Sequence, residues 1–159
     1  MRRLAQPARL RGASMRLRRA FSARVGDAYS ATRRFTQADV AAFTALTHDD
    51  NPLHSDADAG RFGGAVVHGM LCASMFGAIV GQRFPGAIYV SQSLHFRKPV
   101  YVGEEVTATV EVQRAAAVGR VLDFVTRCVN ARGDGVLDGE ARVLLPRTSR
   151  DRAASDDDV

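Results

Sequence analysis

Residues 49–54, Asp-Asp-Asn-Pro-Leu-His, place an acid and an imidazole five residues apart on either side of a rigid Asn-Pro step. Histidine titrates near neutral pH, and a carboxylate beside it can orient the ring or share in proton transfer. Asp49 and His54 can therefore point into one pocket and activate a water molecule. The same residues also suit a capped turn, because Asp and Asn are common in turns and a loop histidine is often only solvated.

A second candidate group lies at residues 68–70, His-Gly-Met, where a long apolar stretch begins. The first N–H groups of a helix are unpaired and its N-terminal dipole end is positive, so the N–H of Gly69 could bind a developing oxyanion. A glycine here could equally serve close packing. We interpret His68 as structural, because its ring could donate to a loop carbonyl. Ser74 either reaches the pocket or bonds back to its own helix.

A helix over residues 36–47 is predicted to lead into the acid/base residues. Thr36 suits an N-cap, and Asp39 would place an acid in the first turn. The residues that follow on one face at helical spacing are Val40, Phe43 and Leu46. The helix should end near Thr47, because Pro52 forbids its continuation and keeps the preceding residue, Asn51, extended.

The most apolar stretch of the chain, residues 66–81, predicts a helix that is buried on most of its sides. Small residues recur in it every four positions, at Gly69, Ala73, Gly77 and Gly81. They would form a narrow stripe that a neighbouring element can approach closely. Between the two helices, residues 48–66 are predicted to form a loop with a short helical turn at 56–60.

Everything after Pro85 is predicted to form about four antiparallel strands. They cover residues 87–96, 106–113, 120–130 and 136–145, with a turn at Gly103-Glu104 and a hairpin turn at Gly133-Asp134-Gly135. The order of a helix, a loop, a buried helix and then strands is satisfied by a single sheet wrapped on one long apolar helix.

Arginine is concentrated at the N-terminus. The chain has 159 residues and a formal net charge of +5, but eight of its 22 basic residues lie in the first 24 positions, where there is no acid. The remaining 14 basic and 17 acidic residues give a net charge of −3. This composition predicts a mitochondrial transit peptide over residues 1–24. The alternatives are an upstream extension of little function and an RNA-binding arm, which normally interleaves aromatics, whereas this segment has only Phe21.

The rest of the chain is predicted to form one domain, residues 27–146, and a disordered acidic tail, residues 147–159. No apolar run approaches the roughly 20 residues that span a bilayer, so we expect no membrane partner. Because the basic N-terminus lacks interleaved aromatics, we expect no nucleic acid as partner either. Cys72 and Cys128 have no partner at metal-ligand spacing in the sequence. We expect both to be buried small side chains, with neither a zinc site nor a disulfide.

Three segments together resemble a known family. Residues 43–59, Phe-Thr-Ala-Leu-Thr-His-Asp-Asp-Asn-Pro-Leu-His-Ser-Asp-Ala-Asp-Ala, resemble the hydratase motif of the MaoC-like, (R)-specific enoyl-thioester hydratases and dehydratases. Residues 66–71, Val-Val-His-Gly-Met-Leu, with Ser74, are similar to the start of that family's central helix. Residues 91–104 resemble the strand and turn after it. The resemblance runs over residues 33–146, and its motifs are far more specific in combination than alone.

The resemblance implies the hot-dog fold, an α+β architecture in which an antiparallel sheet wraps around a central helix. It also implies a homodimer with sites near the subunit interface. Asp49 and His54 would be the acid/base pair that holds and activates water, and Asn51 would support that loop or the water. The N–H of Gly69 would receive the thioester oxygen, and Ser74 would lie near the site. No cofactor and no metal are expected.

One departure from the family pattern lies next to the catalytic acid. The family often has glycine immediately before this Asp, and here the residue is His48. Glycine tolerates backbone conformations that histidine finds costly, so His48 could alter the backbone angles of the loop. It could also place an additional titrating group near the site.

The resemblance implies reversible conversion of an (R)-3-hydroxyacyl thioester into a trans-2-enoyl thioester and water. The predicted transit peptide favours a 3-hydroxyacyl-[acyl-carrier-protein] dehydratase of fatty acid synthesis in the mitochondrial matrix. An (R)-specific enoyl-CoA hydratase is the alternative, as is a cytoplasmic location. Arg97 and Lys98 could meet an acidic carrier protein or a CoA phosphate, or could simply form a solvated turn. A hot-dog thioesterase and a non-catalytic acyl-binding module are further alternatives.

Overall fold

The computed structural model describes residues 23–55, 63–116 and 120–147. The predicted helical turn at 56–60 lies outside the described residues. So do nearly all of the predicted transit peptide, residues 1–24, and of the predicted tail, residues 147–159. Within the described part of the chain, no helix has the length and apolarity to cross a membrane.

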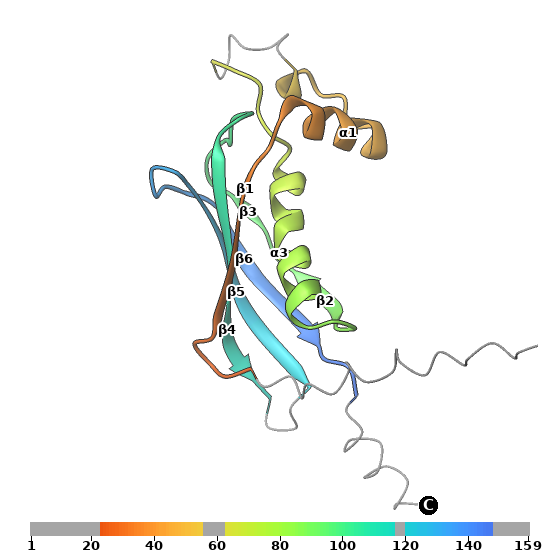
Figure 1. The fold of residues 1–159 in the computed structure, drawn as a ribbon, viewed down its shortest axis with the longest axis vertical. Coiled ribbons are helices and arrows are strands. Elements are labelled where there is room, and N and C mark those ends of the chain that lie inside the picture. The colour runs from red at the N-terminus through yellow and green to blue at the C-terminus, as the bar shows by residue number, and fades with distance from the viewer. Residues whose placement is uncertain (1–22, 56–62, 117–119, 148–159) are drawn as a thin grey trace, which may run out of the picture.

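Helix α1, Gln37–Thr47, starts and ends where the sequence predicts. Thr36 is its N-cap, and a capping box joins it to Asp39: Asp39 N–H donates to Thr36 Oγ1 at 3.2 Å, and Thr36 N–H donates to Asp39 Oδ2 at 2.8 Å. Val40 is buried, but Leu46, which the spacing places on the same face, is 78% exposed. Figure 1 shows the reason: α1 lies beyond the end of the sheet, and its last turn projects away from it.

One antiparallel sheet of six strands forms the body of the molecule. The strands are β1 (Ala28–Arg34), β2 (Ile88–Gln92), β3 (His95–Phe96), β4 (Glu105–Ala115), β5 (Val121–Asn130) and β6 (Gly135–Leu144). The sheet order is β1-β4-β5-β6-β2, and β3 also pairs with β6. The predicted strand 87–96 is divided into β2 and β3, and β1 was not predicted. Nearly all of β1 is exposed, because it is an edge strand, so its sequence lacks the apolar alternation that identifies a half-buried strand.

The central strands alternate between a buried and an exposed face. On β4 the buried residues are Val106, Ala108, Val110 and Val112, as the alternation predicts. Gly133, with φ 81°, forms the predicted hairpin turn between β5 and β6. The buried face of the sheet lies against helix α3, Gly69–Arg83, which runs along it in Figure 1.

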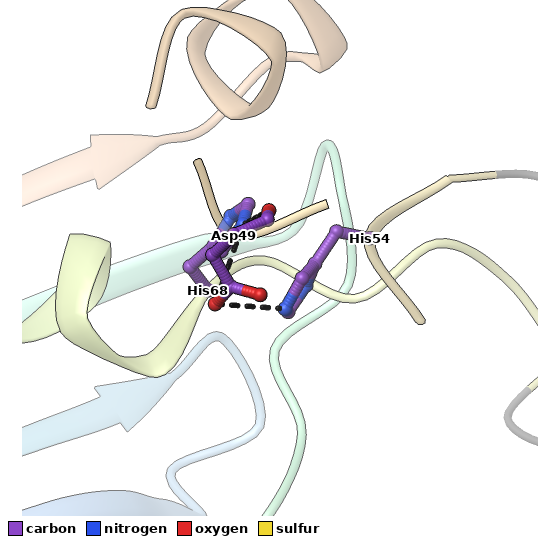
Figure 2. Close-up of side chains that lie close together, drawn as sticks. All are labelled: Asp49, His54 and His68. Atoms are coloured by element: carbon purple, nitrogen blue, oxygen red, sulfur yellow. Dashed lines mark hydrogen bonds and ion pairs between the residues drawn. The ribbon is translucent and has the colours of Figure 1, made fainter. Parts of the chain in front are cut away.

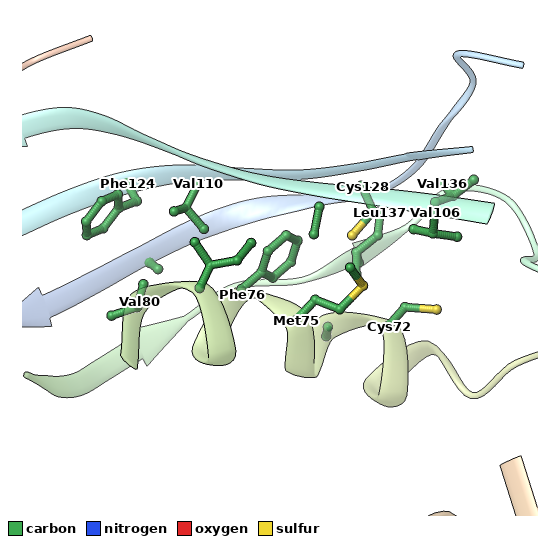
Figure 3. Close-up of a cluster of buried hydrophobic side chains, with 14 of the residues drawn as sticks. Cys72, Met75, Phe76, Val80, Val106, Val110, Phe124, Cys128, Val136 and Leu137 are labelled. Carbon is green, nitrogen blue, oxygen red and sulfur yellow. The ribbon is translucent and has the colours of Figure 1, made fainter. Parts of the chain in front are cut away.

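Helix α3 buries one side and leaves the other open. Its buried residues are Cys72, Ala73, Met75, Phe76, Ile79 and Val80, and they pack against the sheet (Figure 3). Its exposed residues include Met70, Ser74, Gly77, Ala78 and Gly81. The prediction that this helix is buried on most of its sides is therefore wrong for the single chain. The small-residue stripe is close-packed only in part, since a Cβ on Gly77 or Gly81 would meet nothing within 4 Å.

Both cysteines are buried and free, as predicted. Cys72 lies on α3 and Cys128 on β5, within one apolar cluster (Figure 3). Burial raises the pKa of each thiol to about 12. Because the thiolate is the reactive form, neither residue is a nucleophile at neutral pH.

Candidate active site

The acid/base loop, residues 48–55, begins where α1 ends in a left-handed residue. His48 has φ 60° and ψ 23°, and its N–H donates to Thr44 O at 2.8 Å. A residue with a Cβ pays for this conformation, whereas glycine adopts it freely. His48 thus stands at a position whose backbone geometry favours the glycine that it replaces in the family pattern.

Asn51 and Pro52 shape the middle of the acid/base loop. The short 3-10 helix η1, Pro52–His54, follows Asn51, which has the extended backbone predicted for a residue before proline (φ −53°, ψ 127°). Asn51 Oδ1 accepts from Leu53 N–H at 3.2 Å, and its carbonyl accepts from His54 N–H at 3.0 Å. Asn51 therefore caps the turn that presents His54. A contact of Asn51 with water stays a prediction.

A main-chain hydrogen bond orients the His54 ring and selects its tautomer. Nδ1 lies 2.7 Å from Val66 O. A carbonyl oxygen can only accept, so Nδ1 carries the proton and, in the neutral ring, Nε2 carries the lone pair. His54 Nε2 faces Asp49 Oδ2 at 3.9 Å, and the side chain is only 13% exposed. The ring is therefore held with its basic nitrogen toward the carboxylate.

The Asp49 carboxylate approaches two imidazole rings. Its Oδ2 lies 3.9 Å from Nε2 of His54 and 3.9 Å from Nε2 of His68, and Figure 2 shows the three side chains converging. The Asp49 side chain is 52% exposed, so solvent reaches it. The structure thus brings together Asp49 and His54, as the sequence predicts. The gap between the groups is too long for a direct hydrogen bond but suits a shared water molecule.

His68 is part of this group, and the sequence assigned it only a structural role. Its Nε2 lies 3.1 Å from Asp49 O, which confirms the predicted donation to a loop carbonyl. The ring stacks on His54 with centroids 3.6 Å apart and planes inclined by 22°. The sequence signal that could have identified it is the histidine directly before the glycine of the predicted oxyanion site.

Gly69 combines both of the roles considered for it. It is the first residue of α3, and no described residue accepts its N–H, which is therefore free for a ligand. It is also closely packed: a Cβ at this position would lie 2.5 Å from Cε1 of Phe96 on β3. Any side chain at residue 69 would have to displace the Phe96 ring or the start of the helix.

Ser74 lies apart from this group. Its Oγ donates to Leu71 O at 2.6 Å, so the back-bonded alternative is the one that the structure contains. Five residues of helix separate it from Gly69, which corresponds to about 7.5 Å along the axis. Ser74 is on the open side of α3, and a role near the site stays a prediction.

Asp49, His54 and His68 also have the composition of a metal site. One ligand atom from each lies within 4.8 Å of the others. The hydrogen bonds favour proton chemistry instead, because His68 Nε2 is engaged with Asp49 O and would have to lose its proton and this bond to coordinate an ion. The arrangement as it stands supplies one carboxylate, one basic nitrogen and one free N–H.

Arg97 and Lys98, considered above as contacts for a carrier or a phosphate, are already paired. Arg97 forms a two-point ion pair with Asp138, and Lys98 Nζ lies 2.7 Å from Asp134 Oδ1. The hydrogen bond from Lys98 is the largest cause of a lowered pKa of Asp134, which falls to about 2. Hydrogen bonds from Asn130 and Arg132 contribute to the same shift. Both cations remain about half exposed, and each is paired with a carboxylate that neutralises most of its charge.

Two hollows of about 710 and 730 Å³ lie over β2, β3, β4, β5 and β6. Neither is lined by Asp49, His54, His68 or Gly69. Acid/base chemistry depends on converging titratable groups and not on the volume of a hollow. The Asp49 group is therefore the candidate active site.

Comparisons with known proteins agree with this geometry. The chain is 43% identical over 129 residues to the mitochondrial 3-hydroxyacyl-[acyl-carrier-protein] dehydratase of Arabidopsis thaliana, covering 77% of this chain and 78% of that protein. It is 45% identical over 130 residues to the (R)-specific enoyl-CoA hydratase of Aeromonas caviae, covering 79% and 97%. The solved structure of an (R)-hydratase from A. caviae involved in PHA biosynthesis superposes with a TM-score of 0.76 at 44% identity, over 80% of this chain and all of that one.

The family model described as MaoC like domain matches residues 20–131, which is more than half of the chain. The predicted hot-dog architecture is confirmed by the superposition, and the predicted hydro-lyase class by the hydratases and dehydratases among the relatives. The chain therefore belongs to the MaoC-like domain family.

Proposed function

We propose that this protein interconverts (R)-3-hydroxyacyl thioesters and trans-2-enoyl thioesters plus water, with the acyl group carried by acyl carrier protein. The observation that carries the proposal is the pairing of Asp49 Oδ2 with His54 Nε2 at 3.9 Å, with the proton of His54 held on Nδ1 by Val66 O. This pair offers a carboxylate and a lone pair to one water molecule.

In the hydration direction, the lone pair of His54 Nε2 receives a proton from the water as the water oxygen bonds to C3. The electrons of the C2–C3 double bond move toward the thioester, whose oxygen gains negative charge. The dyad then returns a proton to C2, so that its own protonation state is unchanged over the cycle. Dehydration follows the same steps in reverse.

The free N–H of Gly69 would donate a hydrogen bond to the thioester oxygen and stabilise the negative charge that develops there. A hydrogen α to a thioester is only weakly acidic, so the reaction needs a donor at this oxygen. The N–H lies at the positive end of the α3 dipole and needs no reorganisation to bind an anion. Removal of one such donor typically costs about 10²–10³-fold in rate.

Acyl carrier protein in the mitochondrial matrix is the preferred carrier and location. Two plant relatives, from Arabidopsis thaliana and Solanum lycopersicum, are named as mitochondrial 3-hydroxyacyl-[acyl-carrier-protein] dehydratases. The arginine-rich and acid-free residues 1–24 agree with import into mitochondria. The second candidate is an (R)-specific enoyl-CoA hydratase, which is the name of the relative from Aeromonas caviae.

A homodimer fits the surfaces that a single chain leaves open. Strand β2 pairs with β6 on one edge only in the described sheet, and its Ile88 and Val90 are 60% and 55% exposed. Beside it, α3 exposes Met70 and a run of small residues. Burial of these apolar side chains against a second copy would remove a free strand edge. The mass in solution, measured by light scattering, should be twice that of the chain, and Val90→Glu should yield monomers.

Matched substrates test the reaction and the carrier together. Crotonyl thioesters of acyl carrier protein and of CoA lose the absorbance of the conjugated enoyl group on hydration, and the configuration of the product can be determined. We expect an (R)-3-hydroxy product from both and a higher kcat/KM with the carrier protein. A higher value with CoA would favour the enoyl-CoA hydratase.

The same assay separates the remaining classes. Release of free thiol from the acyl thioester would identify a thioesterase, which does not need the Asp-x-Asn-Pro-x-His element. No change in absorbance with either substrate, while the acyl thioester binds, would identify a non-catalytic module. Either result would reject the proposed hydration.

A further inference from the structure

His68 is a buried polar side chain that contributes nothing to its own helix. It is the N-cap residue of α3, yet its side chain makes no capping hydrogen bond. Only 2% of it is exposed, so its polar atoms were removed from water on folding. A buried polar group needs a compensating partner, and in His68 that partner lies in the acid/base loop.

The bond from His68 Nε2 to Asp49 O is the anchor that fixes Asp49 to the body of the domain. The other hydrogen bonds of Asp49 stay within two residues of it along the chain: its N–H donates to Thr47 Oγ1 at 3.3 Å, and its Oδ1 accepts from Asn51 N–H at 3.4 Å. Among the described residues, His68 supplies the one hydrogen bond that reaches Asp49 from a distant element, 19 positions along the chain. Thr44 Oγ1 lies 3.5 Å from the same nitrogen and is the second polar group beside it.

The ring of His68 also sets the plane of His54. The two rings stack with centroids 3.6 Å apart, and Phe43 lies against His68 with a centroid separation of 5.0 Å. A rotation that turned His54 Nε2 away from Asp49 would break the bond from His54 Nδ1 to Val66 O and disturb this stack. One side chain therefore touches both members of the dyad.

The tautomer of His68 follows from its partners. Asp49 O can only accept, so Nε2 carries the proton, and Nδ1 has no hydrogen-bond partner in the described structure. A proton on Nδ1 would be a buried donor without an acceptor. His68 thus donates from Nε2 in a fixed direction, whereas His54 presents Nε2 toward the Asp49 carboxylate.

From these contacts we infer that His68 is a positioning residue, which holds the Asp49 main chain and the His54 ring at the separation that the reaction needs. The inference rests on the proposed hydration at the Asp49–His54 pair. A displacement of about 1 Å in a catalytic group can cost about 10²-fold in rate, so loss of this anchor should act on kcat and leave substrate binding nearly unchanged.

Two substitutions separate the hydrogen bond from the ring. Gln keeps a donor near the place of Nε2, whereas Phe keeps an aromatic ring and removes the donor. We expect His68→Phe to lower kcat about 10²-fold with KM within about threefold of wild type, and His68→Gln to recover at least about tenfold of that loss. Equal kcat for His68→Phe and wild type, or no recovery by His68→Gln, would overturn the inference.

Thr126→Val is the matched control. Thr126 is fully buried and accepts a hydrogen bond from Gln92 Nε2 at 3.0 Å, remote in the sequence from the acid/base loop. Loss of this hydrogen bond in Thr126→Val should lower the melting temperature and leave kcat per folded molecule unchanged. If Thr126→Val lowers kcat as much as His68→Phe at equal loss of stability, the effect of His68 is general destabilisation and not positioning.

Imidazole ¹⁵N NMR of the wild-type protein tests the geometry without any substitution. His68 should be protonated on Nε2 and His54 on Nδ1. Protonation of His68 on Nδ1 alone would contradict the anchor, because the bond to Asp49 O could not form. This result does not depend on turnover, so it distinguishes failure of the positioning role from failure of the proposed reaction, which an inactive wild-type protein would reveal.

Discussion

The sheet–helix core and the acid/base loop are held by opposite kinds of contact. In the core, Phe76 and Phe124 are at most 1% exposed and belong to one cluster of buried apolar residues. In the loop, Asp49 is half exposed, and its position depends on a few hydrogen bonds. Stability in the core is spread over many weak contacts, whereas the function proposed for the loop depends on single atoms. Each region should therefore respond to substitution in a different observable.

The two regions meet at the start of α3. His68 and Gly69 belong to the segment that enters the core, and His68 Nε2 donates to the loop carbonyl of Asp49. The core thus supplies a rigid base on which the loop is oriented. This division explains how a short and largely exposed loop can hold a carboxylate and an imidazole at a defined separation.

Asp49→Asn should have the largest effect on activity. Asn keeps an oxygen that can accept from Asn51 N–H but removes the charge and the basicity of the carboxylate. We expect kcat for hydration of a short enoyl thioester to fall about 10²–10⁴-fold, the range typical for loss of an acid/base group. Because the side chain is 52% exposed, the melting temperature should hardly change.

Asp50→Asn is the matched control, since Asp50 is exposed and neighbours Asp49 in the same loop. It should retain both activity and stability. Near-normal turnover by Asp49→Asn would remove Asp49 from the reaction and with it the contrast between loop and core.

Phe124→Ala should show the opposite response. Phe124 is fully buried on β5, and its ring lies 6.1 Å from that of Phe84. Its truncation should lower the free energy of unfolding by about 3–5 kcal/mol, because it leaves a cavity in a close-packed core. Urea denaturation measures this loss, and Phe124→Leu should lose less. Turnover per folded molecule should stay at the wild-type value, and a fall in kcat without lost stability would break the comparison.

Sequence reasoning succeeded where the signal is local. The capping box at Thr36, the end of α1 before Pro52 and the hairpin turn at Gly133 depend on residues a few positions apart. The pairing of Asp49 with His54 is local in the same sense, because one rigid turn joins them. A pattern of six residues was enough to predict that these two groups lie close together.

Sequence reasoning failed where burial depends on which elements pack against each other in the folded chain. Leu46 and the outer side of α3 are apolar or small in sequence, yet the described chain leaves them exposed. Edge strand β1 carries no alternation because little of it is buried. The donation from His68 to a loop carbonyl was predicted, but its stack on His54 was not, because no spacing rule reports a contact of two rings from separate elements.

Gly69→Ala tests the junction between the two regions. The new Cβ would lie 2.5 Å from Phe96 Cε1 and 2.7 Å from Cδ1, so either the ring or the start of α3 must shift. We expect kcat to fall about tenfold, because the N–H that is proposed to bind the thioester oxygen moves with the helix start. Steady-state kinetics on the same enoyl thioester measure the change.

Phe96→Ala provides the background that isolates this contact. Phe96 is 56% exposed, so its truncation should leave the domain folded. In this background, Gly69→Ala should cost less than in the wild-type protein. An equal cost in both backgrounds would show that the packing against Phe96 is not the reason for glycine at this position.

His48→Gly should have the smallest effect, and it acts on the loop alone. His48 holds φ 60°, a conformation that costs a residue with a Cβ about 1–2 kcal/mol and costs glycine almost nothing. Glycine also makes the unfolded chain more flexible, which offsets about 0.4–1 kcal/mol of that gain. We therefore expect the free energy of unfolding to rise by at most about 1 kcal/mol, measured by urea denaturation, with kcat within about twofold. His48→Ala keeps the Cβ and should bring no gain. A less stable His48→Gly protein would mean that the His48 side chain makes contacts worth more than its backbone strain, and the loop would then resemble the core in depending on side-chain packing.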